Sequence, residues 1–154
     1  MTDTLSHWDK VYQSKDHTQV SWHQNHATLS FDWILAYTDK NANIIDVGSG
    51  VSILADNLLD EGYTHLSLLE LSLTAIQATK ERLKSYSNRV NFYNENILDF
   101  ETDTQYDLWH DRAVFHFLRK DQEINSYLKS LNNGTAADGR LVLGTFAENG
   151  PTRC

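Results

Sequence analysis

The sequence is poor in cysteine, proline, positive charge and long apolar runs. Its single cysteine, Cys154, excludes an internal disulfide and predicts a reducing, cytoplasmic location. Lys and Arg number 13 against 21 Asp and Glu, and the net charge of −8 argues against a protein that holds nucleic acid. No apolar run approaches the roughly 18 residues of a membrane span. The first residues lack the basic and apolar regions of a secretory signal. The single proline, Pro151, lies in a predicted loop close to the last residue.

What the sequence does contain is enough apolar material for one folded domain. Its 154 residues are 40% hydrophobic and 11% aromatic, and a chain of this length can bury about 70% of its unfolded surface. This composition excludes a disordered, collagen-like or coiled-coil protein. We therefore expect a single domain over residues 1–154.

Short apolar runs alternate with helical patterns along the chain. One helix is predicted directly after the first apolar run and ends near Gly62. A second begins after Ser72, a residue type that caps helix N-termini, and a third ends at Asn133-Gly134. Strands that alternate with helices predict an α/β domain with a mostly parallel sheet. The predicted strands are Asn43–Gly48, His65–Leu71, Val90–Asn96, Tyr106–His110 and Arg140–Ala147.

The functional prediction depends on the residues where these strands end, because ligands of such sheets bind at the carboxyl ends of the strands. Gly48 and Gly50 follow the first strand and allow a tight turn before a helix N-terminus. Glu70 ends the second strand, 20 residues after Gly50, close to the spacing at which an acid accepts hydrogen bonds from ribose hydroxyls. Together they favour a nucleoside site. Ile53 stands at the third glycine position of the dinucleotide fingerprint, which disfavours NAD.

The ends of the third and fourth strands add further parts of a pocket. The Asn96 amide can pair with an adenine edge, and Ile97 can pack on the ring. The fourth strand leads into DRAVFHF at residues 111–117, where polar side chains stand between large apolar ones. That composition is typical of a pocket floor.

These motifs, taken in order, resemble those of class I S-adenosylmethionine-dependent methyltransferases. They are DVGSG at residues 46–50, Glu70, Asn96-Ile97 and YDLWHDRAVFHFL at residues 106–118. Trp8, Tyr12 and Trp22 resemble the Trp-x3-Tyr pair and second tryptophan of a subgroup that includes small bacterial enzymes and some protein-lysine methyltransferases. The resemblance implies a Rossmann-like sandwich with a helical cofactor lid at residues 1–40 and a core at 41–147.

The same resemblance implies that the chain is shorter than the family fold. Family sheets have the strand order 3-2-1-4-5-7-6 with the last strand antiparallel, whereas the five strands predicted here give the order 3-2-1-4-5, with strands 6 and 7 missing. Residues 148–154 then begin a truncated connection. The fifth strand is left as an apolar edge, and we expect a homodimer through it.

The resemblance also implies roles for individual residues. The turn after the first strand lies against the methionine part of the cofactor, Glu70 binds the ribose, and Asn96 and Ile97 hold the adenine. Indole faces close over the cofactor, since they attract a sulfonium cation. The implied cofactor-binding residues are Trp8, Tyr12, Trp22, Asp46, Gly48, Ser49, Gly50, Glu70, Leu71, Asn96, Ile97, Asp111 and Arg112.

Methyl transfer from a sulfonium is an in-line displacement, so the protein mainly positions the acceptor and desolvates the site. A general base is needed only if the acceptor arrives protonated. Asp111 and His116 are the candidates, with His110 behind them, although packing explains His116 equally well. Two positions depart from the family pattern. Asn96 stands where many members have Asp, and Ser52 where glycine is common; both substitutions are compatible with binding.

The sequence therefore predicts transfer of a methyl group from S-adenosyl-L-methionine to a small molecule or a protein lysine, leaving S-adenosyl-L-homocysteine. The alternatives are an NAD(P)-dependent Rossmann oxidoreductase and a non-catalytic nucleoside-cofactor-binding protein. No nucleic acid, membrane or metal is expected as a partner. His23 and His26 could share a helical face, but no carboxylate or cysteine completes a metal-ligand set there.

Overall fold

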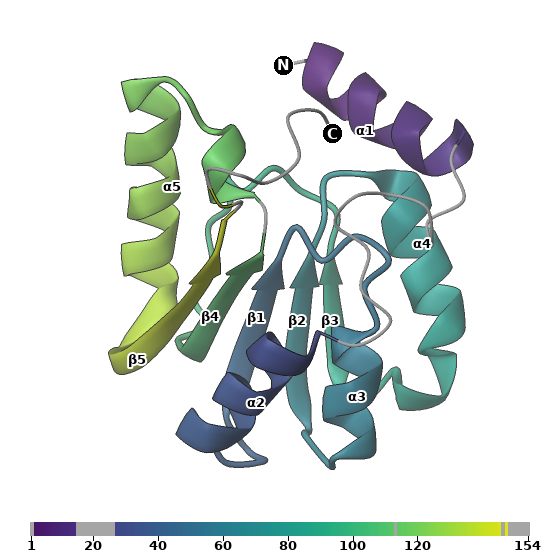
Figure 1. Ribbon diagram of the computed structural model, residues 1–154, viewed down its shortest axis with the longest axis vertical. Coiled ribbons are helices and arrows are strands. Elements are labelled where there is room, and N and C mark those ends of the chain that lie inside the picture. Colours follow the sequence, from purple (N-terminus) through teal and green to yellow (C-terminus); the bar gives the residue numbers. More distant parts are fainter. Residues whose placement is uncertain (1, 15–26, 113, 146, 148–154) are drawn as a thin grey trace.

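A computed structural model of the protein describes residues 2–14, 27–112, 114–145 and 147 (Figure 1). Its centre is a five-stranded sheet in the order β3-β2-β1-β4-β5, and every neighbouring pair of strands is parallel. This confirms the predicted Rossmann-like α/β sheet and its strand order. The strands are β1 (Asn43–Val47), β2 (His65–Leu69), β3 (Val90–Tyr93), β4 (Tyr106–Arg112) and β5 (Thr135–Gly144).

Helices cover both faces of the sheet, and a further helix crosses above the carboxyl ends of the strands (Figure 1). One apolar core joins α2 and α3 to the sheet, and a second joins α5 to the opposite face. The helices are α1 (Thr2–Ser14), α2 (Thr28–Tyr37), α3 (Leu54–Asp60), α4 (Leu73–Arg82) and α5 (Asp121–Gly134), with the short 3-10 turns η2 (Lys84–Tyr86) and η3 (Phe115–Phe117).

Alternate residues of the central strands supply the two cores. Ile44 and Leu108 pack toward α2 and α3, whereas Ile45 and Trp109 pack toward α5. All four side chains are at most 1% exposed. Strands that are apolar on both faces belong in the middle of a parallel sheet, which explains why β1 and β4 occupy its centre.

Helix boundaries agree with the local signals in the sequence. Ser72 is the N-cap of α4, and its side chain accepts a hydrogen bond from the backbone N–H of Ala75. Gly134 ends α5, as the Asn133-Gly134 signal predicts. A Cβ at this glycine would lie 2.8 Å from Cζ3 of Trp109, so close packing against the core requires glycine there.

All five strands differ from their predicted bounds. β1 ends one residue early, at Val47, and β2 ends two residues early, at Leu69. β5 covers Thr135–Gly144, whereas the sequence predicted Arg140–Ala147. It begins directly after α5, and its first five residues, 135–139, include no large apolar side chain, which is why no apolar pattern marks its start. Its register against β4 shifts between Tyr106 and Leu108. β3 ends at Tyr93 rather than at residue 96. β4 extends two residues further than predicted, to Arg112.

Within the described ranges no helix has the length and apolar character needed to span a membrane.

Candidate functional site

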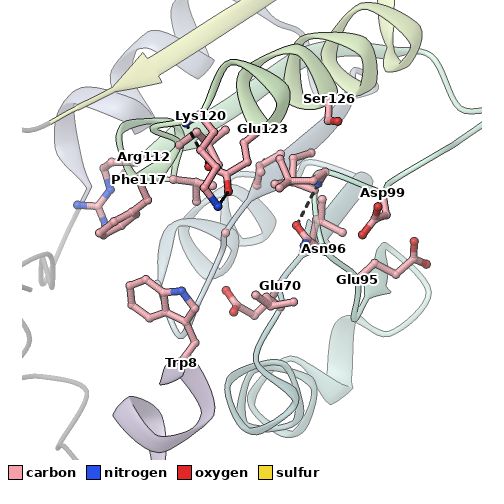
Figure 2. A pocket seen from close by; sticks show the side chains of 18 of the residues that line it. Trp8, Glu70, Glu95, Asn96, Asp99, Arg112, Phe117, Lys120, Glu123 and Ser126 are labelled. Carbon is pink, nitrogen blue, oxygen red and sulfur yellow. Dashed lines mark hydrogen bonds and ion pairs between the residues drawn. The ribbon is translucent and has the colours of Figure 1, made fainter. Parts of the chain in front are cut away.

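A cavity of about 500 Å³ lies at the carboxyl ends of β1, β2 and β4, between α1 and the start of α5 (Figure 2). This is the edge at which a parallel sheet binds its ligands. The cavity is lined by Trp8, Tyr12, Val47, Gly48, Leu69, Glu70, Leu71, Glu95, Asn96, Ile97, Leu98, Asp99, Arg112, Val114, Phe117, Leu118, Lys120, Gln122, Glu123 and Ser126.

Glycine is required twice in the loop after β1. Gly48 has a φ of 65° and Gly50 a φ of 54°, a region that L side chains rarely adopt. Space excludes a side chain as well, because a Cβ at Gly48 would lie 2.0 Å from Cγ2 of Val114, and one at Gly50 would lie 2.5 Å from the Tyr12 hydroxyl. The loop is thus shaped to let other groups approach its backbone closely.

Glu70 connects this loop to the end of β2. Its Oε2 accepts a hydrogen bond from the Gly50 N–H at 2.8 Å, and its Oε1 accepts one from the Ser72 N–H at 2.7 Å. The side chain is only 6% exposed, yet it lines the cavity. Burial raises the pKa of Glu70 to about 7, and the nearby Asp46 also raises it, while the two backbone hydrogen bonds oppose the shift. The carboxyl group is therefore poised to change charge near neutral pH.

The loop after β3 forms one side of the cavity. The Oδ1 atom of Asn96 accepts a hydrogen bond from the Leu98 N–H at 3.0 Å, which fixes the side chain at the cavity wall. The neighbouring Ile97 is 7% exposed and belongs to the core on the α5 side. The predicted residues Asn96, Ile97 and Leu71 therefore all line the cavity.

The N-terminal helix α1 places two aromatic side chains at the cavity. Trp8 packs edge-on against Phe117 of η3, with ring centroids 5.3 Å apart, and Tyr12 lies above Gly50. Arg112, at the end of β4, lines the cavity on the side of η3 (Figure 2). Two predicted residues of α1 and one at the end of β4, far apart in the sequence, thus meet at one site.

Several predicted site residues lie outside the cavity lining. Asp46, Ser49, Gly50, Asp111 and His116 are not among the lining residues, and Trp22 falls outside the described residues. Gly50 lies directly beneath Tyr12, and the Ser49 hydroxyl is buried without a hydrogen-bond partner among the described atoms. Ser49 and Gly50 directly follow Gly48, which does line the cavity.

Asp46 lies in a buried network on the side of the sheet covered by α2. The Nδ1 atom of His110 lies 2.6 Å from Oδ1 of Asp46, and its Nε2 atom lies 2.9 Å from the Ser30 hydroxyl. All three residues are at most 8% exposed. The network ties α2 to β1 and β4, so its evident role is to position these elements.

Asp111 is fully buried and fixes the segment that follows β4. Its carboxylate accepts hydrogen bonds from the Val114 N–H at 2.9 Å, the Phe115 N–H at 3.1 Å and the Tyr127 hydroxyl at 2.7 Å. Burial raises the pKa of Asp111, against these hydrogen bonds. The ring of His116 packs on Phe117 at a centroid distance of 4.2 Å, and burial lowers the pKa of His116. Both environments suit a role in packing and positioning.

The start of α5 forms a part of the cavity that the sequence did not predict. Lys120 is the N-cap of this helix. The Glu123 carboxylate accepts a hydrogen bond from the Lys120 backbone N–H at 3.4 Å and forms a 3.3 Å ion pair with the Lys120 ammonium. The available signal was the acid three residues after the cap, but Lys is not a usual capping residue. The other lining residues that were not predicted are Val47, Leu69, Glu95, Leu98, Asp99, Leu118, Gln122 and Ser126. Val114 and Phe117 also line the cavity, and they belong to the 111–117 segment predicted as its floor.

Comparison with known protein families identifies one matching model. The model of a methyltransferase domain matches residues 45–141, which is more than half of the chain. The match begins inside β1 and ends inside β5, so it covers the sheet and most of the cavity.

Curated relatives are distant in sequence and longer. A malonyl-acyl-carrier-protein O-methyltransferase of Ilyobacter polytropus is 25% identical over 124 residues, which cover 80% of this chain and 45% of that protein. The eEF1A lysine and N-terminal methyltransferase of Bos taurus is 23% identical over 140 residues, which cover 90% of this chain and 20% of that protein. The chain thus spans less than half of the length of either relative.

The fold also resembles solved structures. The N-methyltransferase NodS from Bradyrhizobium japonicum, solved in complex with S-adenosyl-L-homocysteine, superposes with a TM-score of 0.74 at 17% sequence identity. The superposition covers 91% of this chain and 71% of that one. At this identity the likeness concerns the fold.

Proposed function

Because this chain belongs to the methyltransferase-domain family, we propose that it binds S-adenosyl-L-methionine in the cavity and directs methyl transfer to an acceptor. The observation that carries this proposal is Glu70. It is a buried carboxylate at the end of β2 that accepts a hydrogen bond from the glycine loop after β1 and lines the cavity. A nucleoside with two adjacent hydroxyls suits an acceptor in that position.

The residues around the cavity fit such a cofactor. A carboxylate has about four lone-pair sites, and the backbone N–H groups of Gly50 and Ser72 use two of those on Glu70, so the group can still accept from ribose hydroxyls. Asn96, Ile97 and Leu71 form the wall that suits an adenine. Trp8 offers an aromatic face to a sulfonium. When bound, S-adenosyl-L-methionine supplies a methyl group that its sulfonium has already activated.

The part of this chain in the reaction is to orient the reactants and exclude water. α1 covers the cavity, with Trp8 closed against Phe117, and we propose that residues 1–40 act as its lid. Asp111 holds the segment after β4 through its hydrogen bonds to Val114 and Phe115. An acceptor that arrives unprotonated needs no general base, so positioning alone can account for most of the rate. If a base is needed, Asp111 and His116 remain the proposed groups.

We propose a small molecule or a protein lysine as the acceptor. The relatives support either class, since one is named for a malonyl group on an acyl-carrier protein and another for lysine and N-terminal methylation. We also propose a cytoplasmic location and self-association through the edge of β5. Both proposals go beyond the family match.

Binding assays can separate the proposal from its rivals. We expect S-adenosyl-L-homocysteine, followed by isothermal titration calorimetry, to bind and NAD not to bind. NAD binding alone would identify an oxidoreductase and overturn the proposal. A methyl donor with a labelled methyl group, offered to metabolite fractions and to protein fractions of a lysate, should then label one fraction. Binding without transfer to either fraction would indicate a non-catalytic cofactor-binding protein.

A further inference from the structure

Helix α1 carries two neighbouring rows of side chains with different contacts. Trp8 and Tyr12 line the cavity. Asp9 and Gln13, each one position further along, contact the N-terminal turn of α4, where the Gln13 amide donates to the Thr74 hydroxyl at 3.4 Å. One row therefore faces the proposed cofactor site and the other fixes the helix to the body of the protein.

Asp9 caps α4 from outside that helix. Its Oδ1 accepts a hydrogen bond from the Ser72 hydroxyl at 2.6 Å and one from the Thr74 N–H at 3.3 Å. The Ser72 hydroxyl in turn accepts from the Ala75 N–H at 3.2 Å. Two of the N–H groups that a helix leaves unpaired in its first turn are thus satisfied jointly by Ser72 and by a residue of α1. A negative side chain is also favourable at a helix N-terminus.

Ser72 also belongs to the cofactor site. Its backbone N–H donates to Oε1 of Glu70 at 2.7 Å, and the Gly50 N–H donates to Oε2 of the same carboxylate at 2.8 Å. A continuous series of hydrogen bonds therefore runs from the loop after β1, through Glu70 and Ser72, to Asp9 on α1. Asp9 itself is not among the residues that line the cavity.

We propose that Asp9 is a positioning residue for the cofactor site: its bonds to Ser72 and Thr74 hold α1 in the orientation that places Trp8 over the cavity and ties the lid to Glu70. This rests on the proposed function for the identity of the ligand. It assigns Asp9 no contact with cofactor or acceptor. Its effect on binding is indirect and passes through Trp8 and Ser72.

The test compares Asp9→Ala, Asp9→Asn and Ser72→Ala with the wild-type chain. Asp32→Asn is the matched control, because Asp32 is an exposed acid on α2. The first readout is the Kd for S-adenosyl-L-homocysteine by calorimetry. The second, recorded without ligand, is the ¹⁹F signal of Trp8 in protein that carries 5-fluorotryptophan, identified by its loss in Trp8→Phe.

We expect Asp9→Ala to weaken binding about tenfold and to move the Trp8 signal toward that of a solvent-exposed tryptophan. Asp9→Asn keeps an oxygen acceptor, so it should cause a smaller change in both readouts. Asp9→Ala and Ser72→Ala remove the same 2.6 Å hydrogen bond, so their effects on Kd should not add in the double variant. Asp32→Asn should change neither readout.

An unchanged Kd together with an unchanged Trp8 signal in Asp9→Ala would overturn the proposal. Additive effects of Asp9→Ala and Ser72→Ala would also overturn it, because the two groups would then act independently. If Asp9→Ala does not fold, Asp9→Asn decides the matter with the same readouts. If the wild-type chain itself does not bind S-adenosyl-L-homocysteine, the proposed function fails, while the ligand-free Trp8 signal still decides whether Asp9 positions α1.

Discussion

At the scale of single residues, Glu70 governs how the site responds to pH. Burial raises its pKa to about 7, so the folded protein binds a proton there more readily than the unfolded chain does. By linkage, the contribution of Glu70 to stability is fully present below the ordinary carboxyl pKa of 4.5 and is lost as the pH rises through 7. Hydrogen bonds from ligand hydroxyls favour the ionised form, so stability and ligand binding should depend on pH in opposite directions.

We therefore expect S-adenosyl-L-homocysteine to bind up to roughly tenfold more tightly at pH 8 than at pH 6, following the ionised fraction of a group whose pKa is about 7. Glu70→Gln should bind more weakly and lose most of this dependence. Calorimetry across the pH range, with Glu95→Gln as a control for loss of an exposed acid at the same cavity, measures both effects. The same pH slope in Glu70→Gln and in the wild type would assign the titration to another group.

At Gly50, the effect of backbone strain on stability can be separated from the effect of the contact with Tyr12 on ligand affinity. Gly50→Ala introduces strain at a φ of 54° and also places a Cβ against the Tyr12 hydroxyl. Gly62→Ala is a matched control, because Gly62 has a φ of 96° but nothing lies within 4 Å of its Cβ position. We expect both variants to lose about 1 kcal/mol of stability from strain, and only Gly50→Ala to lose ligand affinity. Urea unfolding and calorimetry test this; equal affinity in both variants would contradict a role for contact with Tyr12.

At the scale of elements, the network of Asp46, His110 and Ser30 holds α2 against the sheet. Ser30→Ala would leave the Nε2 atom of a histidine that is 2% exposed without its partner. An unpaired buried polar group costs about 1–3 kcal/mol, so the free energy of unfolding should fall by that amount. The network lies outside the cavity lining, so the Kd for S-adenosyl-L-homocysteine should change less than about twofold.

The control for this variant is Ser85→Ala, at an exposed position, which should leave stability unchanged within about 0.5 kcal/mol. Chemical unfolding followed by circular dichroism gives the stabilities. A large loss of affinity in Ser30→Ala, with little loss of stability, would instead place Asp46 in the cofactor site, as the sequence suggested.

At the scale of the whole molecule, β5 is one of the two edge strands of the described sheet, and β3 is the other. Leu141 and Leu143 are 45% and 39% exposed on β5 and flank the buried Val142. An apolar edge strand with free backbone groups tends to pair with another chain. We expect concentration-dependent dimers by analytical ultracentrifugation, and Leu141→Lys should shift the equilibrium to monomer. Leu128→Lys, at a leucine of α5 that is 40% exposed, should not. A wild-type chain that stays monomeric at every concentration would refute the edge interface.

The sequence by itself determined the order of elements and the residues at the strand ends. Apolar runs predicted β1, β2 and β4 because buried parallel strands need apolar side chains on both faces. Ser72 and Gly134 marked helix ends because capping is a local interaction. Glu70, Asn96 and Ile97 could be placed at one edge because all carboxyl ends of a parallel sheet lie together.

Only the tertiary structure decided which of these residues face the cavity and what each one bonds to. Asp46 points to His110, 64 positions away in the sequence, and Asp111 bonds to Tyr127, so neither carboxylate lines the cavity. The start of α5 forms a cavity wall because the chain returns there after η3, which no local pattern encodes. The link from Asp9 to Ser72 spans 63 positions. Such long-range contacts follow from how the packed elements meet, so local sequence patterns cannot specify them.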